Sequence, residues 1–204
     1  RRYMKQFVYL PLSLHSGAER ALLISFGTGS TAKALRDVDG LREIDVVDIS
    51  RDVLALSDII YPDKADNPLS DPRVKTHVDD GRFYLLTTAK RYDLITSEPP
   101  PPKHAGVVNL YTQEFFELVK GRLAEGGINT HWLPAHALTY DDTRSIVRAY
   151  CEVFHDCTLW KAINLNWMLM GSRDANWATS EFDFLERWET LRASREDHAL
   201  GVEL

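Results

Sequence analysis

Two kinds of site have little support in this sequence, because the residues that build them are scarce. The chain of 204 residues holds two cysteines, Cys151 and Cys157, and neither belongs to a CxxC pair or stands beside a histidine at metal-ligand spacing. The sequence therefore predicts no metal site and no disulfide framework. We expect both cysteines to be buried thiols in a reducing compartment.

Long apolar runs and an excess of positive charge are also missing. Charge or proline interrupts the apolar stretches within about ten residues, short of the roughly 20 that a membrane-spanning helix needs, and no signal peptide is visible. The 24 basic residues are outnumbered by 30 acidic ones, which gives a net charge of -6. Proteins that follow nucleic-acid phosphates concentrate Lys and Arg on one face. We therefore expect small-molecule partners and no nucleic acid.

The first residues, Arg1 to Met4, are typical of the inside of a helix, which indicates a fragment or an excised domain. No membrane span is expected in this chain, although the natural protein could carry one upstream. The expected location is the cytoplasm, or the cytoplasmic face of a membrane in that second case.

The sequence does contain a regular alternation of short apolar runs and longer amphipathic ones. The short runs predict strands at 21–26, 43–48, 74–78, 92–97, 127–132, 156–161 and 166–170. Helices are expected at 31–37, 51–60, 111–123, 140–154 and 178–191, the last as a packing helix without chemistry. Such alternation is typical of βαβ units, so we expect an α/β domain with a mostly parallel sheet and helices on both faces.

A turn with two glycines, Gly27-Thr28-Gly29, follows the first predicted strand. Glycine is needed where the backbone turns sharply or where a ligand lies against the main chain. Asp48 ends the next strand, 19 residues after Gly29, where a carboxylate can accept both hydroxyls of a ribose. The pattern predicts a nucleoside site. NAD is not excluded, because Ala32 is tolerated as the third fingerprint position; a plain turn with a solvated Asp48 is the simpler alternative.

A second loop adds to this prediction. Asp80 and Gly81 follow the third predicted strand, so a carboxylate or an adjacent amide can meet an adenine edge at the same end of the sheet. The predicted donor-binding residues are Gly27, Thr28, Gly29, Asp48, Ile49, Asp80 and Gly81.

These motifs, taken in order, resemble the spermidine synthases, the polyamine aminopropyltransferases. The resemblance runs from Tyr3 to Gly171 and rests on segments 22–48, 71–83, 92–95 and 110–128. It implies a class I methyltransferase-type Rossmann fold with a seven-stranded sheet. We expect this domain over residues 1–175 and a helical tail over 176–204, without the N-terminal β-hairpin domain that the family usually has. The resemblance also implies decarboxylated S-adenosylmethionine as the donor, methylthioadenosine as the released product, and a possible homodimer.

Site residues follow from the same resemblance. Gly27 and Gly29 would flank the donor tail, Asp48 would hold the ribose, and Asp80 would face adenine N6. Glu98 falls where the family has its catalytic aspartate. An attacking amine is protonated at neutral pH, so a carboxylate must orient and deprotonate it. A Glu98 that merely ends a strand beside solvent is the alternative.

The chain departs from the family at several acids. Thr28 and Pro101 stand where spermidine synthases have aspartates, and Lys5 replaces the acid expected two residues after the matching Tyr3. The loop 98–106 is instead similar to the Glu-Pro-rich loop of bacterial spermidine synthase-like domains. Its four prolines stiffen an extended backbone and suit a gate, or alternatively a ligand for a proline-binding partner. The predicted acceptor and gate residues are Tyr3, Pro101, His104 and Tyr111.

Three functions stay open from the sequence. The first is aminopropyl transfer from decarboxylated S-adenosylmethionine to an amine. The second is methyl transfer from S-adenosylmethionine to a small acceptor, since Thr28 removes a negative charge that would repel the donor carboxylate. The third is a non-catalytic nucleoside-sensing domain of a larger membrane protein.

Overall fold

The computed structural model describes residues 2–103, 105–161, 165–174 and 179–193. One sheet of seven strands runs through these residues in the order β3-β2-β1-β4-β5-β7-β6. The strands are β1 (Arg20–Ile24), β2 (Glu43–Asp48), β3 (Val74–Val78), β4 (Tyr92–Ser97), β5 (Leu123–Pro134), β6 (Thr158–Lys161) and β7 (Asn166–Ser172). Strands β1 to β5 are parallel, whereas β7 pairs antiparallel with both β5 and β6. The predicted seven-stranded, mostly parallel sheet is confirmed.

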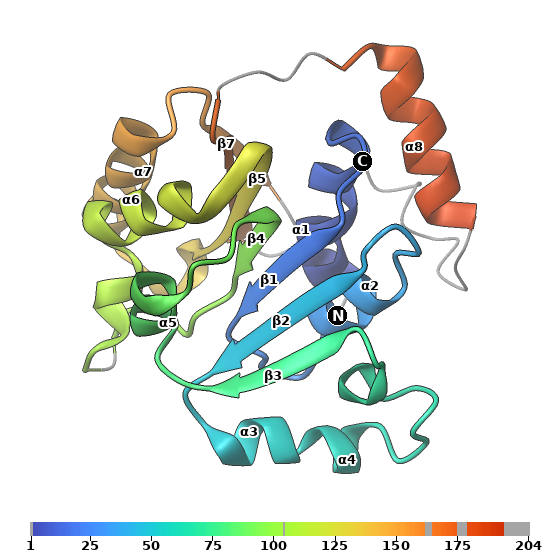
Figure 1. Ribbon diagram of the computed structural model, residues 1–204. Helices are drawn as coiled ribbons and strands as arrows, with labels where there is room; N and C mark the ends of the chain where they lie inside the picture. The colour runs from blue at the N-terminus through green and yellow to red at the C-terminus, as the bar shows by residue number, and fades with distance from the viewer. Residues whose placement is uncertain (1, 104, 162–164, 175–178, 194–204) are drawn as a thin grey trace.

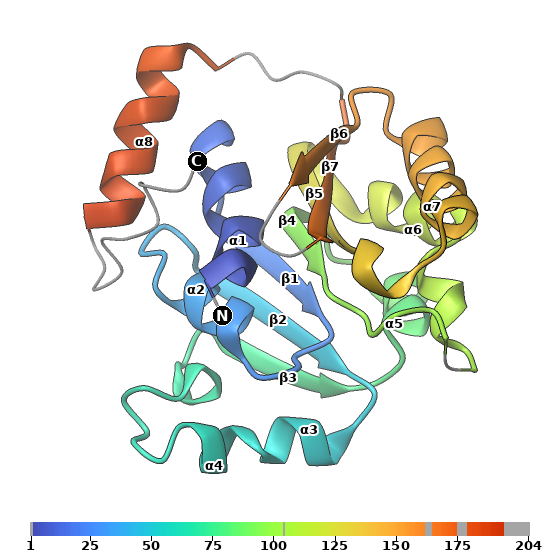
Figure 2. The ribbon, with the colours of Figure 1, turned by 180° about the vertical axis from the view of Figure 1, so that it is seen from behind.

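Helices cover both faces of the sheet (Figures 1 and 2). The helices are α1 (Arg2–Leu14), α2 (Ser30–Arg36), α3 (Arg51–Ala55), α4 (Ser57–Ile60), α5 (Gly81–Thr87), α6 (Gln113–Arg122), α7 (Tyr140–Val153) and α8 (Glu181–Ala193). Short 3-10 turns lie at η1 (Pro68–Ser70), η2 (Val107–Leu110) and η3 (Ala135–Ala137). Helices α1 and α2 pack on one face, and α5, α6 and α7 on the other.

Strand β1 shows why its sequence is apolar throughout. Ala21 and Leu23 enter the core beneath α1 and α2, while Leu22 and Ile24 enter the core beneath α5, α6 and α7. A central parallel strand is buried on both sides, so its sequence reads as a continuous apolar run instead of an alternating one.

Two helices begin where the sequence predicts them, and two other boundaries differ from the prediction. Ser50 accepts a hydrogen bond from the amide of Val53 (3.2 Å) and caps α3, and Thr139 forms a capping box with Asp142 at the start of α7. The predicted helix over 51–60 is interrupted at Leu56, which separates α3 from α4. Gly126, at φ +69°, lies inside β5 and not before it.

The prediction of two free thiols is wrong. Cys151, in the last turn of α7, and Cys157, just before β6, form a disulfide. Phe154 ends the helix and the chain reverses, which brings the two Cα atoms to 5.2 Å, within the range that a disulfide requires. Sequence spacing alone does not reveal such a turn.

Helix α8 packs against α1. Trp188 is buried there, and the Arg187 guanidinium donates from Nε to the Ser13 carbonyl (2.8 Å). The predicted start of this helix, at residue 178, lies outside the described residues. Within the described part of the chain, no helix combines the length and the apolar character that crossing a membrane requires.

Candidate functional site

The predicted donor-binding residues and Glu98 come together at the carboxyl ends of β1, β2, β3 and β4 (Figure 1). Register explains this, because Ile24 at the end of β1 pairs with Val47 of β2 on one side and with Ser97 of β4 on the other. The loops that follow these strands therefore start at the same edge of the sheet. Open α/β sheets bind their ligands at this edge.

The glycine turn is exposed at Gly27 and Thr28 and buried at Gly29. Gly27 and Gly29 have φ values of +57° and +77°, in the left-handed region that favours glycine. The amide of Gly29 donates to the Phe26 carbonyl (2.9 Å), which closes the turn. A Cβ on Gly29 would lie 2.7 Å from Cζ of Phe26, whereas a Cβ on Gly27 would meet nothing within 4 Å. Gly29 is thus required by packing, and Gly27 faces open space.

Tyr61 braces this turn from outside. Its hydroxyl donates to the Thr28 carbonyl (3.0 Å), and its ring lies beneath Gly29. No local pattern singles out Tyr61, because it stands 33 residues from Thr28, directly after α4.

Asp48 lies between the turn and α3. One carboxylate oxygen, Oδ2, accepts the amide of Phe26 (2.8 Å), and Oδ1 accepts the amide of Ser50 (2.9 Å). A carboxylate oxygen can accept two hydrogen bonds, so each keeps capacity for a ribose hydroxyl. Ile49, the next residue, is 73% exposed and offers an apolar surface beside this carboxylate.

Asp80 caps helix α5, and Gly81 allows this helix to pack closely against β1. Asp80 Oδ1 accepts the amide of Phe83 (2.9 Å) and caps the helix. A Cβ on Gly81 would lie 2.5 Å from Cγ2 of Ile24, so glycine lets α5 approach β1. Asp80 is exposed at the same edge as Asp48, and contact with adenine stays a prediction for it.

Glu98 is partly buried directly after β4. Its amide donates to the Ile24 carbonyl (3.1 Å), and its Oε1 accepts a short hydrogen bond from the hydroxyl of Thr31 in the first turn of α2. Burial raises the pKa of the Glu98 carboxyl to about 7. The group is therefore poised to exchange a proton near neutral pH.

The proline loop is anchored by Tyr111, which is buried beneath it. The Tyr111 hydroxyl donates to the carbonyls of Pro99 (3.0 Å) and Pro100 (3.2 Å). Its ring meets the ring of His131 edge-on at 4.9 Å. Burial lowers the pKa of His131 to about 3, so this histidine is a neutral part of an aromatic core with Phe115 and Phe116.

The other predicted acceptor and gate residues are Tyr3, Pro101 and His104. Tyr3 is partly buried on α1, and Pro101 is partly buried in the loop. His104 lies outside the described residues. A cavity of about 380 Å³ lies between the loop and α7, with Lys103 and Asp142 beside a largely apolar wall.

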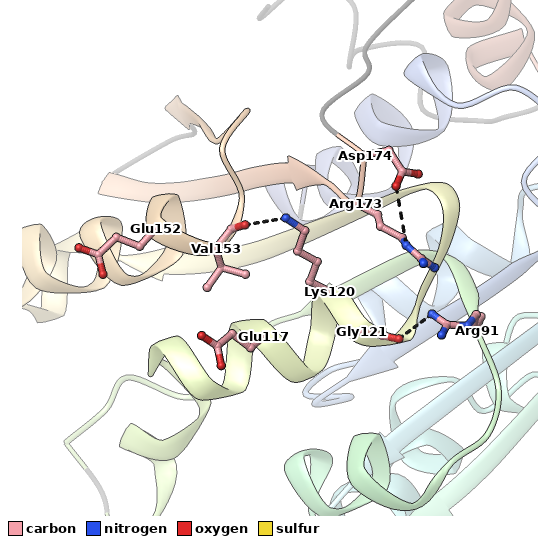
Figure 3. Close-up of a pocket in the computed structure, with 8 residues that line it drawn as sticks. All are labelled: Arg91, Glu117, Lys120, Gly121, Glu152, Val153, Arg173 and Asp174. Carbon is pink, nitrogen blue, oxygen red and sulfur yellow. Dashed lines mark hydrogen bonds and ion pairs between the residues drawn. The ribbon is translucent and has the colours of Figure 1, made fainter.

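A second cavity, of about 470 Å³, lies at the opposite edge of the sheet (Figure 3). Two of its basic side chains donate hydrogen bonds to backbone carbonyls. Arg91 donates to the carbonyl of Gly121 (2.7 Å), and Lys120 donates to the carbonyl of Val153 (2.8 Å). These contacts join the end of α6 to α7 and β4, so the cavity is a structural junction. No cluster of three or more metal-ligating side chains occurs among the described residues.

Comparison with known proteins agrees with this geometry. The family model for the spermine/spermidine synthase domain matches residues 1–163. Polyamine aminopropyltransferase 1 of Pseudomonas aeruginosa is 29% identical over 126 residues, which cover 62% of this chain and 44% of that protein. The chain spans about half the length of the curated relatives it matches.

Solved structures give the same fold. A spermidine synthase in complex with the transition-state analogue AdoDATO superposes with a TM-score of 0.76 at 15% identity, over 98% of this chain and 75% of that one. Human methyltransferase-like protein 13 in complex with SAH gives a TM-score of 0.77 at 18% identity over 100% of both chains. The fold is thus that of the class I methyltransferases. By its sequence match, the chain belongs to the spermine/spermidine synthase family.

Proposed function

We propose that this chain binds an S-adenosyl donor at the carboxyl edge of the sheet and transfers an aminopropyl group from decarboxylated S-adenosylmethionine to an amine. The position of Glu98 carries the proposal, because a carboxyl with a pKa near 7 stands between the glycine turn and the proline loop. The curated relatives named polyamine aminopropyltransferases support this function over the two alternatives.

The donor would lie across three loops. The sulfonium arm of the donor would lie over the turn of Gly27, Thr28 and Gly29, since Gly27 and Thr28 are exposed and a Cβ on Gly27 would meet nothing within 4 Å. Asp48 would accept the ribose hydroxyls with its remaining lone pairs. Ile49, Asp80 and Gly81 would border the adenine. That neighbours in the fold were solved with AdoDATO and SAH supports a donor of this chemical class.

The reaction needs one proton acceptor. The acceptor nitrogen forms a bond to the propyl carbon, the carbon–sulfur bond breaks with its electron pair going to sulfur, and methylthioadenosine leaves. Glu98 takes the proton that the nitrogen must lose. The loop anchored by Tyr111 would cover the reacting groups, with Tyr3, Pro101 and His104 toward the acceptor.

Two measurements test this function. Calorimetric titration with S-adenosylmethionine, its decarboxylated form and methylthioadenosine should show binding, and a transfer assay with amines should release methylthioadenosine. Glu98→Gln should abolish transfer and spare donor binding. If none of the three compounds binds, the proposal is overturned. Unchanged transfer by E98Q would remove Glu98 as the base.

Other outcomes would select the alternatives. A methylated product from S-adenosylmethionine would identify a methyltransferase, and binding without turnover across amine, thiol and carboxylate acceptors would identify a sensor. The domain division at residue 175, the homodimer, the lack of a nucleic-acid partner and the cytoplasmic location stay predictions.

A further inference from the structure

Thr31 occupies an unusual position for a polar side chain. It is the second residue of α2, is 2% exposed, and its hydroxyl donates to Oε1 of Glu98. The other acceptor within reach is the Met4 carbonyl of α1, at 3.5 Å, the long limit for a hydrogen bond. The hydroxyl therefore depends on Glu98 for its main hydrogen bond, and a buried hydroxyl without a partner is unfavourable.

The place of Thr31 in the chain makes this contact rigid. Helix α2 begins directly after Gly29, whose carbonyl accepts the amide of Lys33 (2.8 Å). Gly29 is in turn wedged against Phe26 and Tyr61. The glycine turn therefore fixes where the Thr31 hydroxyl lies, and through it the carboxylate of Glu98.

We propose that Thr31 is a positioning residue for the transfer reaction, which holds Oε1 of Glu98 by its hydroxyl and leaves Oε2 to take the proton of the acceptor amine. The inference rests on the proposed function, in which Glu98 is the base. Within the described chain, Thr31 is the one side chain that hydrogen-bonds to Glu98. Thr31 also links the glycine turn, which would contact the donor, to the Glu98 carboxylate, which would activate the acceptor.

The hydrogen bond has a measurable electrostatic consequence. A donated hydrogen bond stabilises the ionised carboxylate, so Thr31 lowers the pKa of Glu98 against the larger effect of burial, which raises it. Loss of one hydrogen bond to a charged group should raise this pKa by about one to two units. At pH 7 the ionised fraction of Glu98 would then fall about fivefold to fiftyfold, and it would recover as the pH rises.

Other titratable groups around Glu98 do not obscure this effect. Burial raises the pKa of Tyr111, which anchors the loop, and lowers that of His131, which pairs in register with Ser97, to about 3. Both therefore stay neutral between about pH 5 and 9. The positive charge of the amino terminus also lowers the pKa of Glu98, and Tyr3 and Lys5 flank Met4 on α1. All three groups are present in wild type and variants alike, so their influence cancels in the comparison.

The test uses Thr31→Val, which removes the hydroxyl at nearly constant shape, and Thr31→Ser, which keeps it. The Glu98 carboxyl is titrated by carbon-13 NMR on glutamate-labelled protein, with its signal assigned by its loss in Glu98→Gln. We expect T31V to raise the Glu98 pKa and to move the acidic limb of the kcat profile to higher pH by the same amount. Donor Kd should be unchanged, and T31S should behave as wild type.

An unmoved Glu98 titration in folded T31V, or a T31S protein that behaves like T31V, would overturn the role of Thr31. Circular dichroism checks folding, and Thr31→Ala replaces T31V should the valine variant not fold. Wild-type protein that transfers nothing would overturn the proposed function instead. The titration separates the two, because it does not depend on turnover.

Discussion

The carboxylate of Asp48 holds the backbone amide of Phe26, with 2.8 Å between Oδ2 and the nitrogen. Phe26 is the residue directly before the glycine turn, so the acid proposed to bind ribose also fixes the start of that turn. In the proposed site, one side chain would thereby couple donor binding to the shape of the loop.

Replacing Asp48 by Asn should weaken donor binding by about tenfold to a hundredfold, since hydrogen bonds to a charged group contribute about 1.5–3 kcal/mol. The amide group must also direct NH2 toward one of the two backbone amides, so Tm should fall. Calorimetric titration with methylthioadenosine measures the first effect. Asp52→Asn, an exposed acid in the first turn of α3, is the matched control. Wild-type affinity in D48N would remove Asp48 from the site.

Alanine should lower the stability of the protein more at Gly29 than at Gly27. Both have positive φ, which for alanine costs about 1–2 kcal/mol, but only in Gly29→Ala does the new Cβ meet Phe26 at 2.7 Å. We expect G29A to lower the free energy of unfolding by about 1–3 kcal/mol more than G27A, from overpacking. Urea denaturation measures this difference.

Donor binding should show the reverse order among variants that fold. The Cβ of Gly27→Ala would point into the open space that we assign to the donor, so G27A should lose affinity out of proportion to its loss of stability. A G27A protein with wild-type donor affinity would show that the ligand does not lie against this turn.

The strand, turn, helix and strand around Gly27 could be predicted because each step is encoded locally. Leu22 and Leu23 give a strand buried on both faces, the glycines give the turn, and Ser50 gives the next cap. The contact from Thr31 to Glu98 could not be predicted, because it joins residues 67 apart in sequence. Thr31 reads as an ordinary first-turn residue until β1 and β4 are known to be neighbours.

Two other features could not be read from the sequence. The family resemblance places Tyr111 among the acceptor and gate residues, but it does not show that the ring is buried and that the hydroxyl holds the loop from beneath. The disulfide depends on the reversal of the chain after Phe154, which no spacing rule describes. By contrast, the capping role of Asp80 could have been read from its place before α5, since Asp is a preferred N-cap.

Tyr111→Phe should separate loop anchoring from packing. The variant keeps the ring against His131 and loses the hydrogen bonds to the carbonyls of Pro99 and Pro100. Stability should fall by about 1 kcal/mol. If the loop closes over the reacting groups, kcat should fall by about tenfold, since misplaced groups react slowly, while donor Kd stays constant. Tyr140→Phe, at a residue 79% exposed, is the control. Unchanged kinetics in Y111F would show that this anchor does not limit transfer.

Reduction of the disulfide should affect stability and leave the site intact. The bond closes a short loop between the end of α7 and β6, and closing such a loop stabilises a protein by about 2 kcal/mol. Both cysteines lie away from the carboxyl ends of β1 to β4, so donor affinity should not change. We expect the Cys151→Ser, Cys157→Ser double variant to unfold at lower urea, with faster hydrogen exchange in β6 and β7. Reductant should lower wild-type stability to that of the double variant and leave the variant unaffected. Equal stability of the oxidised and reduced wild type, with thiols confirmed by mass spectrometry, would show that the α7–β6 turn is held by packing alone.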